Sequence, residues 1–270
     1  MKHLLILLLL SAGFLFAAGE TLSMGTHSAW QRINGKGELT CVKARRGGEI
    51  FTVRGKVNYR SLETLPVSPD KFYKLSGDFK AAPGSEPAAI YFGIIPFDAD
   101  MKQIGSGEVN VINGTATVLT RAAAEGDTIL QVADASAWKE GSNCAVAFNA
   151  AGDFSDLPNR TLVSIGKIRK TADGYEITLK KPLTKAYPAG CPVRQHQHGS
   201  TYPYNAAAQK VSGKWQNFSV LIHGEALTGV PHVKWWHGTR NAAIIMLVNY
   251  GGDDNSEMLV KNVMLEELTR

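Results

Sequence analysis

The stretch PHVKWWHGTR (residues 231–240) is followed directly by NAAIIMLVNY (residues 241–250). On an extended strand, neighbouring side chains point to opposite faces. Trp235 and Trp236 therefore share one core only if the strand that carries them is covered on both sides. Either one ring is exposed, or both are buried in a layered structure with a third element over the strand. Residues 242–250 are apolar on both faces, which predicts a central strand.

Alternating apolar and polar residues elsewhere indicate an all-β chain. Within residues 72–80, Tyr73, Leu75 and Phe79 alternate with polar side chains, as expected for a strand with one buried face. Residues 89–95 are apolar on both faces and predict an inner strand. Almost no stretch has a sustained helical period, so we expect a β-sandwich.

The middle of the chain differs from the rest. It contains short alternating stretches with few aromatics, separated by turn clusters such as Glu125-Gly126-Asp127. This pattern suits a small barrel or sandwich of its own. We therefore expect residues 113–196 to form a small β subdomain, inserted into a sandwich that residues 20–112 and 197–270 build together.

The first residues have the features of a secretory signal peptide. A basic start at Lys2 precedes an apolar run over residues 4–18, and Ala17-Ala18-Gly19 supplies small residues for cleavage. We expect residues 1–19 to be removed and the mature chain to be secreted, periplasmic or held at the cell surface. The alternative is an uncleaved anchor, although the run is near the short limit for a span. No other stretch is apolar enough to cross a membrane.

Positive charges exceed negative ones but are scattered. The sequence has 29 Lys and Arg against 24 Asp and Glu, a formal net charge of +5. Arg45-Arg46 and Lys180-Lys181 are short pairs rather than basic patches, which argues against nucleic acid as a partner. The charge is compatible with an acidic polysaccharide without requiring one.

Three cysteines, Cys41, Cys144 and Cys191, follow the apolar start. Export would permit disulfide bonds. Cys144 and Cys191 both fall within the expected insertion, so they are the pair that we expect to be bridged. The alternative is that all three are buried thiols.

Aromatic and histidine side chains of the last third form the candidate binding site. A sugar ring has apolar faces and a polar rim, so its recognition needs stacking rings beside hydrogen-bonding groups. We expect the double-tryptophan stretch and the segment after the insertion to border one groove. The candidate carbohydrate-binding residues are Trp235, Trp236, His237, Tyr202, Tyr204 and His198. The alternative places the tryptophans in the core and the tyrosines at a packed edge.

No known catalytic motif is present, and no catalytic residue is assigned. His196 and His198 stand two apart, but a metal site would need a third ligand with hydrogen-bonded support. We expect solvated loop histidines there, and the identity of any metal ligand is left open. Asp98 and Asp100 lack the other ligands of a calcium loop, so a turn is the expected structure.

Three features of the outer segments point to one family. They are Val67-Ser68-Pro69 before a strand that begins FYKLSG, the run YFGII (residues 91–95) followed by FDAD, and the ending from Trp215 to Leu265. These features resemble the jelly-roll carbohydrate-binding modules attached to secreted polysaccharide-degrading enzymes, which have a galactose-binding-like β-sandwich. The resemblance implies an all-β jelly-roll sandwich that binds carbohydrate.

The same resemblance bears on a cofactor and on the insertion. Many family members bind a structural calcium through a glutamate on an early strand, and Glu38 and Glu49 are both candidates for it here. No other cofactor is implied. The inserted segment, through GDTILQV (residues 126–132), resembles small β-modules of phage tail and surface proteins.

Three hypotheses about function follow. The first is a secreted, non-catalytic protein that recognises a polysaccharide through exposed aromatics. The second is a polysaccharide lyase or glycoside hydrolase on the same scaffold. The third is a structural or adhesion protein of a cell surface or virion. The oligomeric state and the glycan are not determined by the sequence.

Overall fold

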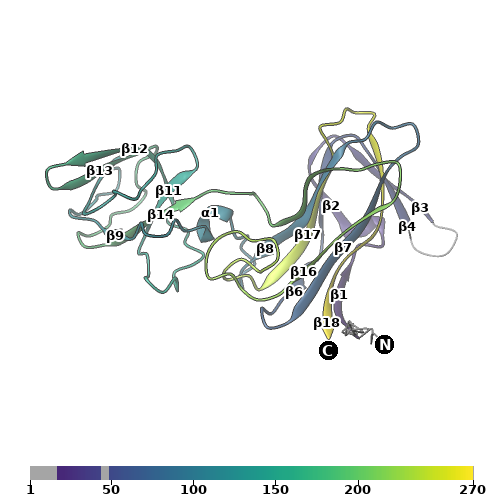
Figure 1. Cartoon of the computed structure of the whole chain (residues 1–270), viewed down its shortest axis with the longest axis horizontal. Coiled ribbons are helices and arrows are strands. Elements are labelled where there is room, and N and C mark those ends of the chain that lie inside the picture. Colours follow the sequence, from purple (N-terminus) through teal and green to yellow (C-terminus); the bar gives the residue numbers. More distant parts are fainter. Residues whose placement is uncertain (1–16, 44–48, 270) are drawn as a thin grey trace, which may run out of the picture.

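The structure, a computed structural model, describes residues 17–43 and 49–269. It is all-β apart from the helix α1 (Ser106–Val109) and the 3-10 helix η1 (His27–Ala29). The predicted fold class, an all-β jelly-roll sandwich, is confirmed (Figure 1). Most of the predicted signal peptide and the Arg45-Arg46 pair lie outside the described residues. Within the described part, neither helix has the length or apolar character to cross a bilayer.

Two antiparallel sheets of six strands form the sandwich, and we name each after one of its strands. The β7 sheet has the order β16-β7-β18-β4-β3, with β1 also paired to β18. Its strands are β16 (Gln216–Ile222), β7 (Phe72–Ala81), β18 (Glu257–Thr269), β4 (Glu49–Arg54), β3 (Glu38–Lys43) and β1 (Ala17–Ser23). The β8 sheet has the order β15-β8-β17-β5-β2, with β6 also paired to β17. Its strands are β15 (Tyr204–Lys210), β8 (Ala89–Phe97), β17 (Asn241–Tyr250), β5 (Val57–Ser61), β2 (Trp30–Gly35) and β6 (Leu65–Pro66).

The chain passes repeatedly from one sheet to the other. β7 is followed by β8 in the opposite sheet, and β15 to β18 alternate between the two sheets. The strands at the same position in the two sheet orders are consecutive in the chain: β16 and β15, β7 and β8, β18 and β17. This is the connectivity of a jelly roll, in which two sheets pack face to face.

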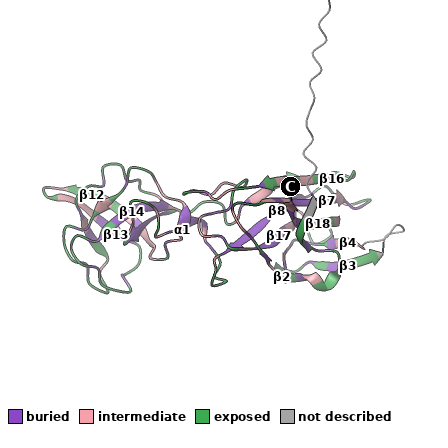
Figure 2. Cartoon of the chain, turned by 90° about the horizontal axis from the view of Figure 1, so that it is seen from below, coloured by how far each residue is buried: buried purple, intermediate pink, exposed green. Residues whose placement is uncertain are grey.

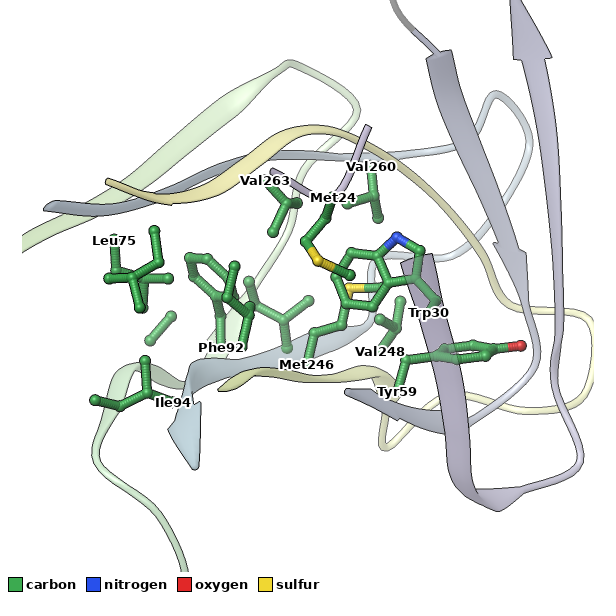
Figure 3. Close-up of a cluster of buried hydrophobic side chains, with 14 of the residues drawn as sticks. Met24, Trp30, Tyr59, Leu75, Phe92, Ile94, Met246, Val248, Val260 and Val263 are labelled. Carbon is green, nitrogen blue, oxygen red and sulfur yellow. The ribbon is translucent and has the colours of Figure 1, made fainter. Parts of the chain in front are cut away.

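The main core lies between the two sheets because each strand turns its alternate apolar residues inward. Leu75 and Val260 come from the β7 sheet, and Phe92 and Met246 from the β8 sheet (Figure 3). Phe79 and Phe92 meet edge to face across the layers, with ring centroids 5.2 Å apart. The buried parts of these strands therefore hold the two sheets together (Figure 2).

The third sheet consists only of strands that lie between Thr117 and Gln197. Its order is β10-β13-β12-β11-β14-β9, and it stands at the far end of the molecule from the sandwich (Figure 1). It has a core of its own, which includes Leu130, Val146 and Phe148. Its strands are β9 (Thr117–Val118), β10 (Ile129–Val132), β11 (Cys144–Phe148), β12 (Val163–Thr171), β13 (Gly174–Leu179) and β14 (Pro192–Gln197).

The predicted disulfide between Cys144 and Cys191 is wrong, since both are buried free thiols. Strand register gives the reason. Cys144 pairs with Gln197 at one end of β11, whereas Phe148 at the other end pairs with Val193. Cys191 lies beyond that far end, well outside the separation of about 4.4–6.8 Å between Cα atoms that a disulfide requires.

The insertion also touches the sandwich through the loop before β12. Arg160 in this loop forms an ion pair with Asp98 at 2.8 Å and lies 3.6 Å from Glu108. The backbone N–H of Asn159 donates a hydrogen bond of 2.9 Å to the carbonyl oxygen of Glu108. Asp98 follows β8 and Glu108 lies in α1, so this loop fastens the insertion to the end of the β8 sheet.

A buried polar network supports the same junction. Arg194 donates through Nε to Nε2 of His196 at 2.9 Å and pairs with Asp156 at 2.7 Å. Nδ1 of His196 lies 2.7 Å from the carbonyl oxygen of Gly107. Since Nε2 accepts from Arg194, Nδ1 carries the proton and donates to Gly107. His196 is fully buried, and this burial lowers its pKa to about 4.

Acid should weaken the junction. An ordinary imidazole has a pKa of 6.5, and folded His196 has a pKa of about 4. Between pH 4 and pH 6.5, His196 therefore binds a proton in the unfolded chain but not in the folded chain. This contribution to the free energy of unfolding is complete above pH 6.5 and falls as the pH drops toward 4, by up to about 3 kcal/mol. Urea unfolding near neutral pH and near pH 4 measures it. His196→Gln should show a smaller loss than the native chain, and an equal loss would contradict the assignment to His196.

Candidate functional site

The outer face of the β8 sheet carries a second apolar surface. On β8, Ile90, Phe92 and Ile94 point into the main core, so Tyr91 and Gly93 point outward. Four outward residues of β8 and β17 form a separate hydrophobic cluster on this face, with Tyr202 and Tyr204 packed against it. The four residues are Ile95, Phe97, Ala243 and Ile245. The segment that enters β15 therefore folds over the outside of the sheet.

Four tyrosines form a continuous line on this outer surface, and we call them the tyrosine face. Ring centroids lie 5.8 Å apart between Tyr202 and Tyr204, 5.0 Å between Tyr204 and Tyr91, and 4.9 Å between Tyr91 and Tyr250. Each contact is edge to face, the arrangement that aromatic pairs prefer. Tyr250 is 40% exposed and the other three are half-buried. The line thus combines residues from β8, from the end of β17, and from β15 and the segment before it.

The phenol of Tyr204 is a hydrogen-bond donor at every physiological pH. Burial, followed by the neighbouring tyrosines Tyr202 and Tyr91, raises its pKa to about 12. A protonated phenol donates one hydrogen bond and also accepts. The tyrosine face therefore offers both flat apolar rings and polar tips.

Gly93 allows β15 to approach β8 closely. A Cβ atom at this position would collide with the carbonyl oxygen of Pro203 and would lie 2.8 Å from the Cα of Tyr204. Both partners are backbone, which cannot swing aside as a flexible side chain does. The absence of a side chain at Gly93 thus sets the position of Tyr204 over the sheet.

We expect Gly93→Ala to displace Tyr204 and break the line of rings. Forcing an extra methyl group into a packed site costs about 1–3 kcal/mol of folding free energy. The variant should also expose Tyr204, which a lower pKa for its phenol, read by ultraviolet titration of tyrosine, would report. Gly84→Ala is a useful comparison because no atom lies within 4 Å of the added Cβ, although its φ of +79° adds strain. An unchanged tyrosine titration in Gly93→Ala would contradict this role.

A polar stripe on β5 runs beside the tyrosine face. Asn58 lies opposite Leu247 and Arg60 opposite Ile245, both on the neighbouring strand β17. Lys56, just before β5, places its ammonium group 5.0 Å from the ring centroid of Tyr250, a cation–π contact. We call Lys56, Asn58 and Arg60 the β5 stripe.

The guanidinium of Arg60 is available to a ligand on this face. Arg60 donates to the side-chain oxygen of Gln31 at 3.1 Å, which leaves other guanidinium N–H groups available. Among the described residues, Oδ1 of Asn58 and Nδ2 of Asn205 are buried without a hydrogen-bond partner. Both atoms are shielded from solvent, so a ligand on the outer surface does not reach them with the side chains in these positions.

The face carries the groups that recognise a sugar ring. Stacking rings and hydrogen-bonding groups are the two elements that bind a ring with apolar faces and a polar rim. The six strands of the β8 sheet contain no Asp, Glu or His. Paired carboxylates, on which most glycoside hydrolases depend, are therefore lacking in these strands.

Neither tryptophan of the predicted site is exposed. Residues 231–239 form a loop between β16 and β17 and not a strand, with one isolated bridge from Trp235 to Glu225. Trp235 enters the main core, where its ring lies 5.2 Å from that of Tyr73, and Trp236 enters a cluster with Ile104 and Val109 beside α1. Both rings have 0% exposure. The interpretation of one exposed ring as a platform is wrong, because the two rings fill two separate apolar clusters.

The other predicted site residues divide into two groups. Tyr202 and Tyr204 lie together on the tyrosine face. His198 is exposed and lies against Gly107 in α1, and its backbone N–H donates to Asn143 at 2.7 Å. His237 is half-buried in the tryptophan loop, and its Nδ1 has no hydrogen-bond partner among the described residues. The two histidines have surroundings different from those of the tyrosines, and the single groove that would join all six residues stays a prediction.

The two candidate calcium ligands differ in their surroundings. Glu38 pairs in register with Arg54, whereas Oε2 of Glu49 is buried without a hydrogen-bond partner among the described residues. Asp98 accepts the backbone N–H groups of Asp100 and Lys102 at 2.9 Å each, as in a turn. In residues 17–43 and 49–269, no three His, Cys, Asp or Glu side chains are grouped to hold a metal ion. Calcium sites also collect backbone carbonyl and amide oxygens, so a structural calcium at Glu38 or Glu49 stays a prediction.

Comparison with known proteins finds likeness only among solved structures. No protein-family model and no curated protein matches the chain. The CBM22-1 xylan-binding domain of Paenibacillus barcinonensis Xyn10C is 11% identical, with a TM-score of 0.38, and the match covers 96% of this chain and 99% of that one. A family 11 carbohydrate-binding module from Clostridium thermocellum, in complex with a β-1,3-1,4-mixed-linked tetrasaccharide, is 11% identical, with a TM-score of 0.32 and coverage of 92% and 96%. At such scores the fold rests on the strand pairing described above, and these carbohydrate-binding modules are proteins to which the chain is similar.

Proposed function

We propose that the chain is a secreted, non-catalytic carbohydrate-binding protein that holds a polysaccharide on the tyrosine face. The observation that carries this proposal is the line of four tyrosines, each within 5.8 Å of the next, on the outside of one sheet. Contiguous aromatic surface outside the core marks a site of interaction. The β5 stripe beside it supplies the hydrogen-bonding groups that orient a sugar ring.

Secretion is part of the proposal on the strength of residues 1–19. Their basic start, apolar run and small residues have the order of a signal peptide. A polysaccharide outside the cell is then the polymer that the chain would meet. Mass spectrometry of the chain purified from its own culture medium or periplasm tests this part, since the proposal requires an N-terminus at Glu20.

Binding is tested by affinity electrophoresis of residues 20–270 in gels that contain one polysaccharide each. The panel holds xylan, mixed-linked β-glucan, mannan and several acidic glycans. The proposal expects retardation in at least one gel, without shortening of the polysaccharide. Shortening of the polysaccharide would favour the enzyme hypothesis. Absence of retardation in every gel would favour the structural or adhesion hypothesis.

A further inference from the structure

The two sheets of the sandwich differ in their acidic residues. The six strands of the β8 sheet contain no Asp or Glu, and their basic residues are Arg32, Arg60 and Lys210. Five of the six strands of the β7 sheet carry acidic residues. These are Glu20, Glu38, Glu49, Asp78, Glu257, Glu266 and Glu267. The strands of the sheet that bears the tyrosine face thus carry no acidic side chain.

The cations beside the tyrosine face also lack counter-ions. In the described part of the chain, neither Lys56 nor Arg60 forms an ion pair. On the β7 sheet, by contrast, Lys74 lies 3.6 Å from Glu266. Two unpaired cations beside an aromatic surface produce a positive potential there, which attracts negatively charged ligands.

We propose that the tyrosine face binds a carboxylate-bearing polysaccharide, with Lys56 and Arg60 pairing with its uronate groups. This inference rests on the proposed function and adds the class of glycan. A uronate keeps the apolar faces of its sugar ring, so stacking on the tyrosines is retained. Its carboxylate matches the planar fork of Arg60, which binds a carboxylate through two parallel hydrogen bonds.

The spacing of the two cations suits an extended chain with an acid group on successive residues. The contact of Lys56 with Tyr250 places its ammonium on the tyrosine face, and Arg60 follows four positions later on β5. An extended chain of that length spans about 13 Å. The two cations therefore engage different sugar residues of one chain. Asn58 stands between them on β5.

The test compares each acidic polysaccharide with its carboxyl-reduced form, which has the same backbone and no charge. Polygalacturonate, alginate and glucuronoxylan serve as probes, measured by isothermal titration with residues 20–270. We expect at least one of them to bind about tenfold or more tightly than its reduced form, since pairs at exposed cations add modest energies that sum over two sites. The difference should shrink as salt is added, because the Debye length falls from about 10 Å at 0.1 M.

Protein variants assign the effect to the two cations. Lys56→Gln with Arg60→Gln should weaken binding of the acidic form about tenfold and leave the reduced form unchanged. The matched control is Lys80→Gln with Lys214→Gln, which removes the same charge on β7 and in the loop before β16. The control should bind like the native chain, and the thermal unfolding midpoint of each variant confirms that it is folded.

The outcomes separate this inference from the proposed function. Equal binding of acidic and reduced forms, or equal losses in both variants, would overturn the carboxylate assignment while leaving a carbohydrate-binding face. Preference for a sulfated glycan over every uronate would also overturn it. Failure of all glycans, charged or neutral, would overturn the inference together with the proposed function.

Discussion

Replacing Trp235 by alanine should destabilise the sandwich by about 3–5 kcal/mol, the usual cost of truncating a buried tryptophan in a packed core. Its ring is fully buried among residues of both sheets and meets Tyr73 edge to face at 5.2 Å. The cavity left by the ring cannot close without moving β7, which pairs with both of its neighbours. Urea unfolding followed by circular dichroism measures the change.

Trp215→Ala is the matched control for this change. Trp215 is 36% exposed, and the ammonium of Lys261 lies 4.3 Å from its ring centroid. Its removal should cost no more than about 1 kcal/mol. If Trp235→Ala were as mild as Trp215→Ala, the placement of Trp235 in the core would be wrong. Loss of glycan binding in Trp235→Ala would in any case follow from unfolding and would not identify a site.

Replacing Tyr91 and Tyr250 together by alanine should abolish most glycan binding while leaving the fold intact. Tyr91 is the ring that joins Tyr204 to Tyr250, so its loss divides the tyrosine face. Truncation of a central aromatic at an interface costs about 1–2 kcal/mol or more, so both changes should weaken binding about 100-fold. Titration with whichever polysaccharide retards the native chain measures the loss.

The same control variant distinguishes the two faces of the sandwich. Trp215→Ala removes an exposed ring near the β7 sheet and should bind like the native chain. Full affinity in the double tyrosine variant, with loss in Trp215→Ala, would move the site to the opposite sheet. Tyr91 and Tyr250 lie on the outer face, so their removal should change the unfolding midpoint less than Trp235→Ala does.

The fold could be predicted because strand periodicity is local. Residues 72–80 alternate as β7 does in the structure, and residues 242–250 are apolar on both faces because β17 lies between the core and the outer cluster. The prediction of a strand over residues 233–239 is wrong, since this segment is a loop in the structure. Gly238 has a φ of +80°, which belongs to a turn and interrupts an extended chain just before β17.

The site was less predictable because strand pairing brings its residues together from distant parts of the sequence. Tyr202 and Tyr204 are close in the sequence, whereas Tyr91 and Tyr250 reach them only through the pairing of β8 with β15 and β17. In the sequence, Tyr91 is one of several apolar residues of a predicted inner strand. A signal for it existed in the alternation of Ile90, Phe92 and Ile94, which leaves Tyr91 on the opposite face. The absence of acidic residues from a whole sheet becomes visible only once the strands are sorted.

Hydroxyl-radical footprinting with and without saturating polysaccharide tests the central claim most directly. It reports the solvent accessibility of individual aromatic side chains in the intact chain. Our account predicts protection of Tyr91, Tyr204 and Tyr250 in the complex, with Trp215 as reactive as in the free protein. Protection of Trp215 with unchanged tyrosines would contradict it and place the ligand on the β7 sheet.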